Sequence, residues 1–162
     1  MRTLVLGLGN AILGDDRVGL AVAEAVRRRL PPDAGVEVDE EHRGGLRLME
    51  RLVGYDRAIL VDALCAEGYP PGAVVLLGPD DVPTENSASS HDMSLPAALR
   101  LGAEMGLHMP DVAIVAVTAC DVKDFSEELS PAVAAAVPQA VETVLAEARA
   151  GAPEPAPAGR PT

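Results

Sequence analysis

The sequence predicts an α/β fold, a three-layer α/β/α sandwich around a mostly parallel sheet of about five strands. Short apolar segments typical of buried strands alternate along the chain with segments of helical periodicity. Apolar residues make up 48% of the chain and aromatic residues only 2%. The core must therefore consist of Val, Leu, Ile and Ala, as in strands that helices cover on both faces. At 162 residues the chain is long enough for one domain.

Two strand–helix pairs are predicted in the first part of the chain. Residues 3–7 are apolar and end at a glycine, which is typical of a buried strand. Residues 16–30 repeat apolar side chains at helical spacing until two consecutive prolines end the helix. A second strand over residues 36–40 and a short helix over residues 46–53 follow.

The second part of the chain contains the clearest central strand, residues 57–62, whose middle residues are all apolar and whose last residue is Asp62. Pro96 fits only the first turn of a helix, so a helix must begin between residues 90 and 94 and run to about 106. The other predicted elements are a strand at 73–77, a polar loop at 78–90, a strand at 112–118 and a helix from the Ser130 cap to about 150.

Two features are expected near the C-terminal end. Pro138 should kink or split the last helix, because proline removes one helical hydrogen bond. We expect residues 1–150 to form a single α/β domain. Residues 151–162 are rich in Pro and Ala and contain no large apolar side chain, so we expect a disordered tail.

The charge and the cysteine content limit the classes of partner. The formal net charge is −12, which disfavours nucleic acid and anionic membranes. No apolar run of 18 residues is present, so no transmembrane helix is expected, and the short apolar N-terminus suits a first strand better than a signal peptide. Cys65 and Cys120 form no CxxC motif and fit a reducing cytoplasm.

A glycine turn follows the first strand, with Gly7, Gly9 and Asn10 before the first helix. The turn is not a dinucleotide-binding motif, since that motif requires glycine where Ile12 stands. Asp15 and Asp16 at the helix start would also repel a phosphate. We expect Asp15 to cap its own helix, which leaves the second acid without a structural purpose.

Asp16, Asp62 and His91 are the candidate functional residues. Each lies at the end of a predicted strand or at the start of a helix, and in an open α/β sheet these places converge on one crevice. Each residue alone has an ordinary structural explanation, as a loop cap or a surface histidine. Together, two oxygens and one nitrogen suit Zn, Ni, Mn or Fe. Three ligands without a thiolate favour an open site over a closed structural zinc site.

The chain contains two other histidines. His42 follows the second strand and either lines the crevice or is a solvated loop residue; both interpretations stay open. His108 precedes the last strand and is expected at the opposite edge, without a role in the site. His91 lies near a helix N-terminus, which favours the neutral imidazole that ligates metals.

On these residues the chain resembles the hydrogenase maturation proteases, the endopeptidases that trim the C-terminus of the nickel-iron hydrogenase large subunit. The resemblance covers residues 1 to about 145. The matching segments are residues 4–10, 14–19, 44–46, 61–63, 71–72 and 90–95. Two departures are visible: some relatives carry Glu where Asp16 stands, and Arg17 interrupts a common glycine-rich pattern.

The resemblance implies a function and a set of site residues. Asp16, Asp62 and His91 would complete the coordination of nickel carried by the substrate, a site that zinc or cadmium could also occupy. Asp16 and Asp62 would be the catalytic residues of an aspartic-type peptidase. Whether a carboxylate or the metal activates the attacking water is left open. The expected substrate-contacting residues are Gly9, Asn10, Gly44 and Gly45.

Two other functions stay open on the sequence. A peptidyl-tRNA hydrolase-like esterase also begins with a strand and a Gly-Leu-Gly-Asn turn, but such an enzyme must bind RNA, which a net charge of −12 opposes. A non-catalytic metal-binding maturation factor would need the same three ligands. The expected partner in the protease interpretation is the hydrogenase large-subunit precursor.

Overall fold

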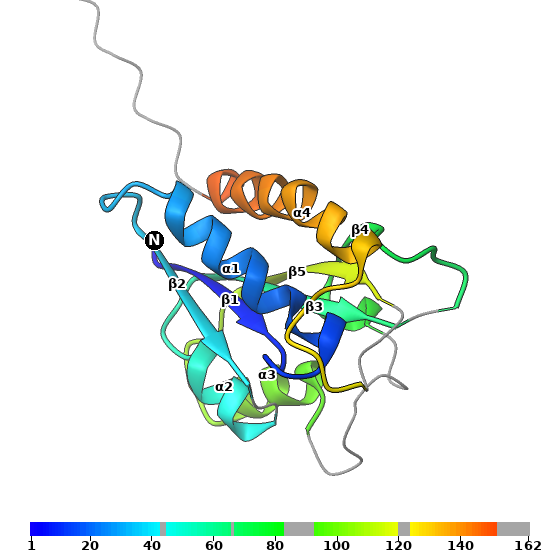
Figure 1. Cartoon of the computed structure of the whole chain (residues 1–162). Coiled ribbons are helices and arrows are strands. Elements are labelled where there is room, and N and C mark those ends of the chain that lie inside the picture. Colours follow the sequence, from blue (N-terminus) through cyan, green and yellow to red (C-terminus); the bar gives the residue numbers. More distant parts are fainter. Residues whose placement is uncertain (43–44, 66, 83–92, 120–123, 152–162) are drawn as a thin grey trace, which may run out of the picture.

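The computed structural model describes residues 1–42, 45–65, 67–82, 93–119 and 124–151. Its sheet has five strands in the order β2-β1-β3-β5-β4 (Figure 1). Only β4 is antiparallel to its neighbour, β5, so the mostly parallel sheet predicted from the sequence is confirmed. The strands are β1 (Thr3–Leu8), β2 (Val36–Glu41), β3 (Arg57–Leu64), β4 (Val74–Leu77) and β5 (Asp111–Thr118).

Helices cover both faces of the sheet, which makes three layers (Figure 1). The helices α1 (Val18–Arg29) and α4 (Pro131–Ala150) lie on one face, and α2 (Leu46–Leu52) and α3 (Leu95–Glu104) lie on the other. Two short 3-10 helices, η1 (Gly14–Arg17) and η2 (Pro79–Asp81), lie between these elements. Among the described residues, no helix is both long and apolar enough to cross a membrane.

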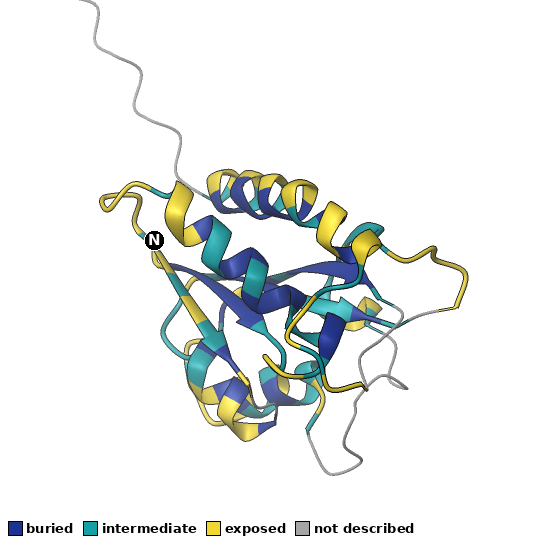
Figure 2. Ribbon diagram, in the orientation of Figure 1, coloured by how far each residue is buried: buried dark blue, intermediate teal, exposed yellow. Residues whose placement is uncertain are grey.

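The strands bury alternate side chains on opposite faces, as their period of two requires. Val5 of β1 packs with α1 and α4, whereas its neighbours Leu4 and Leu6 pack with α2. Figure 2 shows the central strands buried, with the exposed residues of the helices turned outward. In the described part of the chain the buried apolar residues include no aromatic side chain, as the composition predicted.

The predicted elements are confirmed, but several boundaries differ. The helix expected from residue 16 begins at Val18, because residues 14–17 form the 3-10 turn η1. The central strand continues two residues beyond Asp62. Helix α3 begins one residue later than expected, at Leu95, with Ser94 as its N-cap and Pro96 in its first turn.

The sequence predicts that Pro138 kinks or splits the last helix; α4 continues through Pro138, so the split is wrong. Pro138 and Ala134 are both exposed, so water can bond the Ala134 carbonyl that loses its helical donor. A proline on the solvent face therefore leaves the packing of α4 intact. Of the expected tail, residues 151–162, only Gly151 is described, as a turn at the end of α4; residues 152–162 lie outside the described residues.

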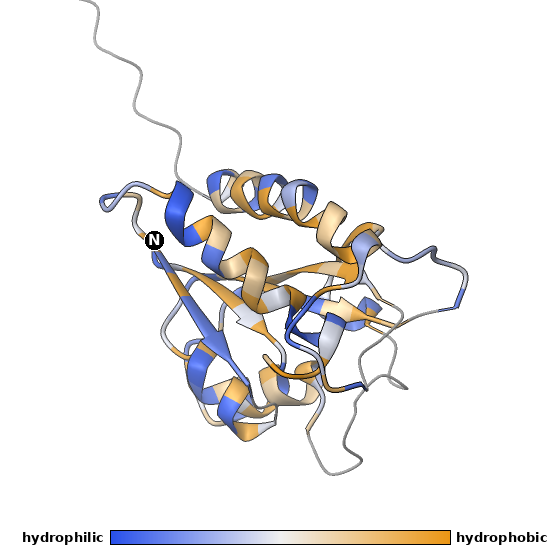
Figure 3. Ribbon diagram, in the orientation of Figure 1, coloured by the Kyte–Doolittle hydropathy of each residue, from blue (hydrophilic) through white to orange (hydrophobic). Residues whose placement is uncertain are grey.

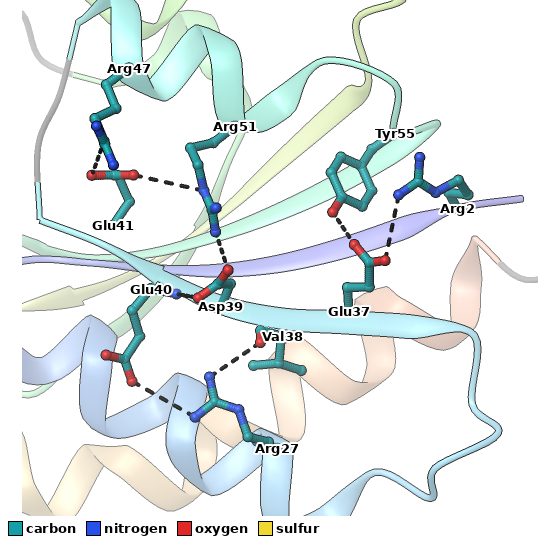
Figure 4. Close-up of polar contacts among 10 residues, drawn as sticks. All are labelled: Arg2, Arg27, Glu37, Val38, Asp39, Glu40, Glu41, Arg47, Arg51 and Tyr55. Atoms are coloured by element: carbon teal, nitrogen blue, oxygen red, sulfur yellow. Dashed lines mark hydrogen bonds and ion pairs between the residues drawn. The ribbon is translucent and has the colours of Figure 1, made fainter.

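The edge strand β2 is acidic, in contrast to the apolar central strands (Figure 3). Its acids alternate between the two faces: Asp39 pairs with Arg51 of α2, while Glu40 lies 3.9 Å from Arg27 of α1 (Figure 4). Buried Glu41 lies 3.6 Å from Arg47 and 3.7 Å from Arg51. Charged edge strands discourage pairing with another chain, and these ion pairs fix β2 beside the helices.

Candidate active site

The strand order places a switch point between β1 and β3. From β1 the chain crosses to β2 on one side, and from β3 it proceeds to β4 and β5 on the other. The pairing of β1 with β3 ends at Gly7 opposite Val61, and Asp62 is the next residue of β3. Ligands of open α/β sheets bind at the carboxyl ends of the strands at such a point. Asp62 therefore lies where this fold class forms its sites.

Three glycines bring the start of α1 against the ends of these strands. A Cβ at Gly19 would lie 2.3 Å from the carbonyl oxygens of both Leu8 and Val61, and a Cβ at Gly7 would lie 2.4 Å from the Gly19 carbonyl oxygen. A Cβ at Gly9, whose φ is +144°, would lie 1.9 Å from the Asp16 carbonyl oxygen. Only glycine allows this backbone packing. The packing places η1 at the edge of the sheet where Asp62 follows the apolar residues 58–61 of β3.

Asp16 projects from η1 and is half-buried. Its Oδ2 accepts a hydrogen bond from the Asn10 N–H at 2.9 Å, so the glycine turn fixes the carboxylate. Burial raises the pKa of Asp16 above its ordinary value, and the Asn10 bond opposes that rise. The turn that resembles a nucleotide-binding loop instead holds an acid.

The pKa of Asp62 departs further from its ordinary value than the pKa of Asp16 does. Burial and then the negative charge of Asp16 raise the pKa of Asp62 to about 7, while the bond from the Ala63 N–H to Oδ1, 2.8 Å long, lowers it. Since the charge of Asp16 acts on Asp62, the two carboxylates lie near each other. A carboxyl group with a pKa near 7 exchanges a proton at neutral pH, which is a property of catalytic acids and bases.

Each of the two carboxylates keeps one oxygen available. Asp16 uses Oδ2 and Asp62 uses Oδ1 for a backbone N–H. Within the described part of the chain, Asp16 Oδ1 and Asp62 Oδ2 accept no hydrogen bond. Two acids that repel each other in a partly buried place are costly without a proton or a cation between them. The pair is suited to a shared proton, a water molecule or a divalent cation.

Asp15 has a different role from the one that the sequence predicted. It is 1% exposed and does not cap its own helix; neither η1 nor α1 has a side-chain cap. Its Oδ1 and Oδ2 accept hydrogen bonds from the N–H and the hydroxyl of Ser130, at 2.7 and 2.9 Å. Asp15 therefore fastens η1 to the N-cap of α4. Sequence reasoning could not find this contact, because 115 residues separate the two partners.

The remaining predicted site residues are only partly described. His91 and Gly44 lie outside the described residues, so the third ligand of the predicted set is untested. Gly45 is the N-cap of α2 and has a φ of +68°. Exposed His42 contacts the Gly9 carbonyl oxygen through Nδ1 at 3.1 Å, so it lies beside the glycine turn.

His108 lies beside Asp56, 2.9 Å away through Nε2, near the start of β3. This is the opposite edge of the sheet, as predicted. No group of three or more His, Cys, Asp or Glu side chains within the described ranges could hold a metal ion. Of the three predicted ligands, Asp16 and Asp62 lie among the described residues, and their role as ligands stays a prediction.

Comparisons with known proteins show the family of this chain. The sequence model of the hydrogenase maturation protease family matches residues 20–147. The chain belongs to the hydrogenase maturation protease family. It is 30% identical over 154 residues to the hydrogenase 2 maturation protease of Escherichia coli K12, an alignment that covers 92% of each chain.

Solved structures of this protease family share the fold. The hydrogenase maturating endopeptidase HybD of Escherichia coli matches with a TM-score of 0.79 and 31% identity over 93% of each chain. The nickel-iron hydrogenase maturation protease HybD of Thermococcus kodakarensis matches with a TM-score of 0.68 and 27% identity, over 91% of this chain and 99% of that one. The likeness extends over almost the whole length of these maturation proteases.

Proposed function

We propose that this protein is an endopeptidase that removes the C-terminal extension of a nickel-loaded nickel-iron hydrogenase large-subunit precursor. Membership of the maturation protease family supports the reaction class. The observation that carries the proposal is the pair Asp16 and Asp62, whose charges interact at the switch point of the sheet. Paired acids with separated roles are a recurrent device for water-dependent hydrolysis.

Nickel enters this proposal as part of the substrate. Asp16 Oδ1 and Asp62 Oδ2 are the available oxygens, and carboxylate oxygens with an imidazole nitrogen from His91 form a donor set that accepts nickel or zinc. A divalent cation on the precursor would also relieve the repulsion between the two acids. The protease would then engage only precursors that already carry the metal.

The chain's own residues can carry out the hydrolysis. The Asp62 carboxylate is suited to accept a proton from a water molecule as that water attacks the scissile carbonyl carbon. The tetrahedral intermediate collapses when Asp62 returns the proton to the leaving amine and the C–N bond breaks. Asp16, held by the Asn10 N–H, orients the substrate. Gly9, Asn10, Gly44 and Gly45 are proposed to contact the peptide on either side.

Mass spectrometry of the precursor tests this proposal. The purified protein is incubated with nickel-loaded precursor, and we expect a mass loss equal to one C-terminal fragment. Asp62→Asn should abolish the loss, and the matched control Asp33→Asn, an exposed acid in the loop between α1 and β2, should retain it. Nickel-free precursor should stay intact.

Other outcomes identify the alternatives. A precursor that stays full length while binding the protein would overturn the protease proposal in favour of a non-catalytic maturation factor. Cleavage that proceeds equally with and without nickel would overturn the nickel-recognition part alone. Affinity for tRNA at low salt, without cleavage of the precursor, would favour the esterase.

A further inference from the structure

Two segments that are far apart in the sequence are joined beside the candidate active site. The Gly14 N–H donates to the Ser126 carbonyl oxygen at 2.8 Å, and the Ser126 N–H donates to the Ile12 carbonyl oxygen at 2.9 Å. These bonds form a parallel bridge in which Leu13 lies opposite Ser126. The segment before η1 and the segment before α4 therefore form one short two-stranded unit.

Side-chain bonds hold this unit in place. Arg17 Nη1 donates to the Glu127 carbonyl oxygen at 2.6 Å, and the buried Asp15 carboxylate holds Ser130 at both of its oxygens. The two segments are thus fixed to η1 and α4 at several points. Side chains that project outward from the unit are presented in a defined orientation.

The outward side chains of this unit are apolar. Phe125 is 83% exposed and is the only phenylalanine in the chain, and Ile12 is 48% exposed. Because Leu13 lies opposite Ser126, the preceding residues Ile12 and Phe125 are cross-strand neighbours on the other face of the bridge. Single exposed apolar residues are ordinary, but an adjacent pair on a fixed frame is typical of an interaction surface.

This apolar pair lies close to the edge of the sheet that carries Asp16 and Asp62. The Leu13 carbonyl oxygen accepts the Asp16 N–H at 3.0 Å, so Ile12 lies four residues from the acid and on the same turn. A protein substrate that reaches Asp16 would therefore lie close to the apolar pair.

The charges around the pair indicate the chemistry of the partner. Asp124, Glu127 and Glu128 flank Phe125 and are exposed, in a chain with a net charge of −12. The described residues form no ion pair with the side chain of Glu127 or Glu128. The surface is therefore complementary to an apolar side chain flanked by lysine or arginine.

We propose that Ile12 and Phe125 form a docking surface for an apolar segment, flanked by basic residues, of the protein substrate. The inference rests on the proposed protease function and names a part of the precursor's binding site outside the paired acids. Aromatic side chains are frequent anchors of such contacts, because they bury a large area with few rotatable bonds.

Steady-state kinetics with the nickel-loaded precursor test the docking surface. Phe125→Ala and Ile12→Ala should each raise KM about fivefold or more with little change in kcat, because binding is lost and the chemistry is retained. Phe125→Leu should recover part of the affinity. The matched control is Met105→Ala. Met105 is 60% exposed and lies at the C-terminal end of α3. Because the chain enters β5 from there, Met105 is at the opposite edge of the sheet from Asp62.

A second variant tests the charge complement. Glu127→Gln combined with Glu128→Gln should raise KM at low salt and reduce its dependence on salt, because these exposed charges are screened at high ionic strength. Direct binding of the precursor to each variant, measured by biolayer interferometry, should weaken in parallel with the rise in KM.

The outcomes separate the two proposals. If the wild-type protein cleaves the precursor and Phe125→Ala does so with an unchanged KM, the docking surface is refuted while the protease proposal stands. If the wild-type protein binds without cleaving, the protease proposal fails, and weaker binding by Phe125→Ala but not by Met105→Ala supports the surface. If the wild-type protein neither binds nor cleaves, both are refuted.

Discussion

Both carboxylate oxygens of Asp15 accept hydrogen bonds from Ser130, one from its N–H at 2.7 Å and one from its hydroxyl at 2.9 Å. The contact joins the turn that carries Asp16 to the start of α4. The two acids are adjacent in the sequence but have separate roles. Asp15 stabilises the fold, whereas Asp16 has one carboxylate oxygen, Oδ1, that accepts no hydrogen bond from the described residues.

Asp15→Ala should destabilise the fold strongly. The substitution leaves two partly buried donors of Ser130 without their acceptor and separates η1 from α4, so we expect the free energy of unfolding to fall by about 2–4 kcal/mol. Ser130→Ala removes only the hydroxyl bond and should cost about 1 kcal/mol. Urea denaturation measures both, with exposed Asp33→Ala as the control. Equal stabilities of Asp15→Ala and Asp33→Ala would show that the contact is absent.

Asp62→Asn should stabilise the protein at neutral pH while it removes the proposed activity. The folded-state pKa of Asp62, about 7, lies above the ordinary value of 3.8. Asp62 therefore favours folding below pH 3.8, and that contribution is lost as the pH rises through 7. Relative to wild type, Asp62→Asn should gain nothing near pH 4 and about 1–3 kcal/mol above pH 7. Urea denaturation across this pH range measures the difference; a constant difference would contradict the assignment.

Asp16→Asn should lower the pKa of Asp62. Removal of the Asp16 charge removes the repulsion, but burial remains, so the pKa should fall below 7 and stay above 3.8. NMR titration of the Asp62 carboxyl carbon in wild type and in the variant measures this directly. Asp39→Asn, on the face of β2 toward Arg51, is the control and should leave the titration of Asp62 unchanged. An unaltered midpoint in Asp16→Asn would place the two acids too far apart to share a ligand.

Gly19→Ala should destabilise the protein although alanine is the better helix former. Helix propensity alone would favour alanine by about 1 kcal/mol, but its Cβ would lie 2.3 Å from two backbone carbonyl oxygens. Overpacking against backbone should reverse the sign, with a net loss of about 2 kcal/mol or more. The matched control is Gly102→Ala in α3, where the three atoms nearest to the added Cβ all belong to the flexible Met109 side chain; this variant should change stability by less than about 1 kcal/mol. Thermal unfolding compares the two.

The order of secondary structure could be predicted from the sequence, because it depends on local patterns. The apolar residues before Asp62 predict a strand, and Ser130 followed by Pro131 predicts the start of a helix. The 3-10 turn at residues 14–17 could not be predicted, because it arises where Gly9 and Gly19 press the helix start against the strands. Whether Pro138 splits α4 could not be predicted for a related reason, because the effect of the proline depends on which face of α4 meets water.

The sequence by itself determined the α/β class, the family resemblance and the acids at strand ends, since residue type and spacing carry that information. Only the tertiary structure decided what each acid does. Asp15 meets Ser130 and Asp62 feels the charge of Asp16 because the parallel sheet brings distant segments to one edge. The same packing pairs Ile12 with Phe125 on the surface. The burial of a side chain and the charges around it depend on every segment that packs beside it. A local sequence pattern therefore cannot predict them.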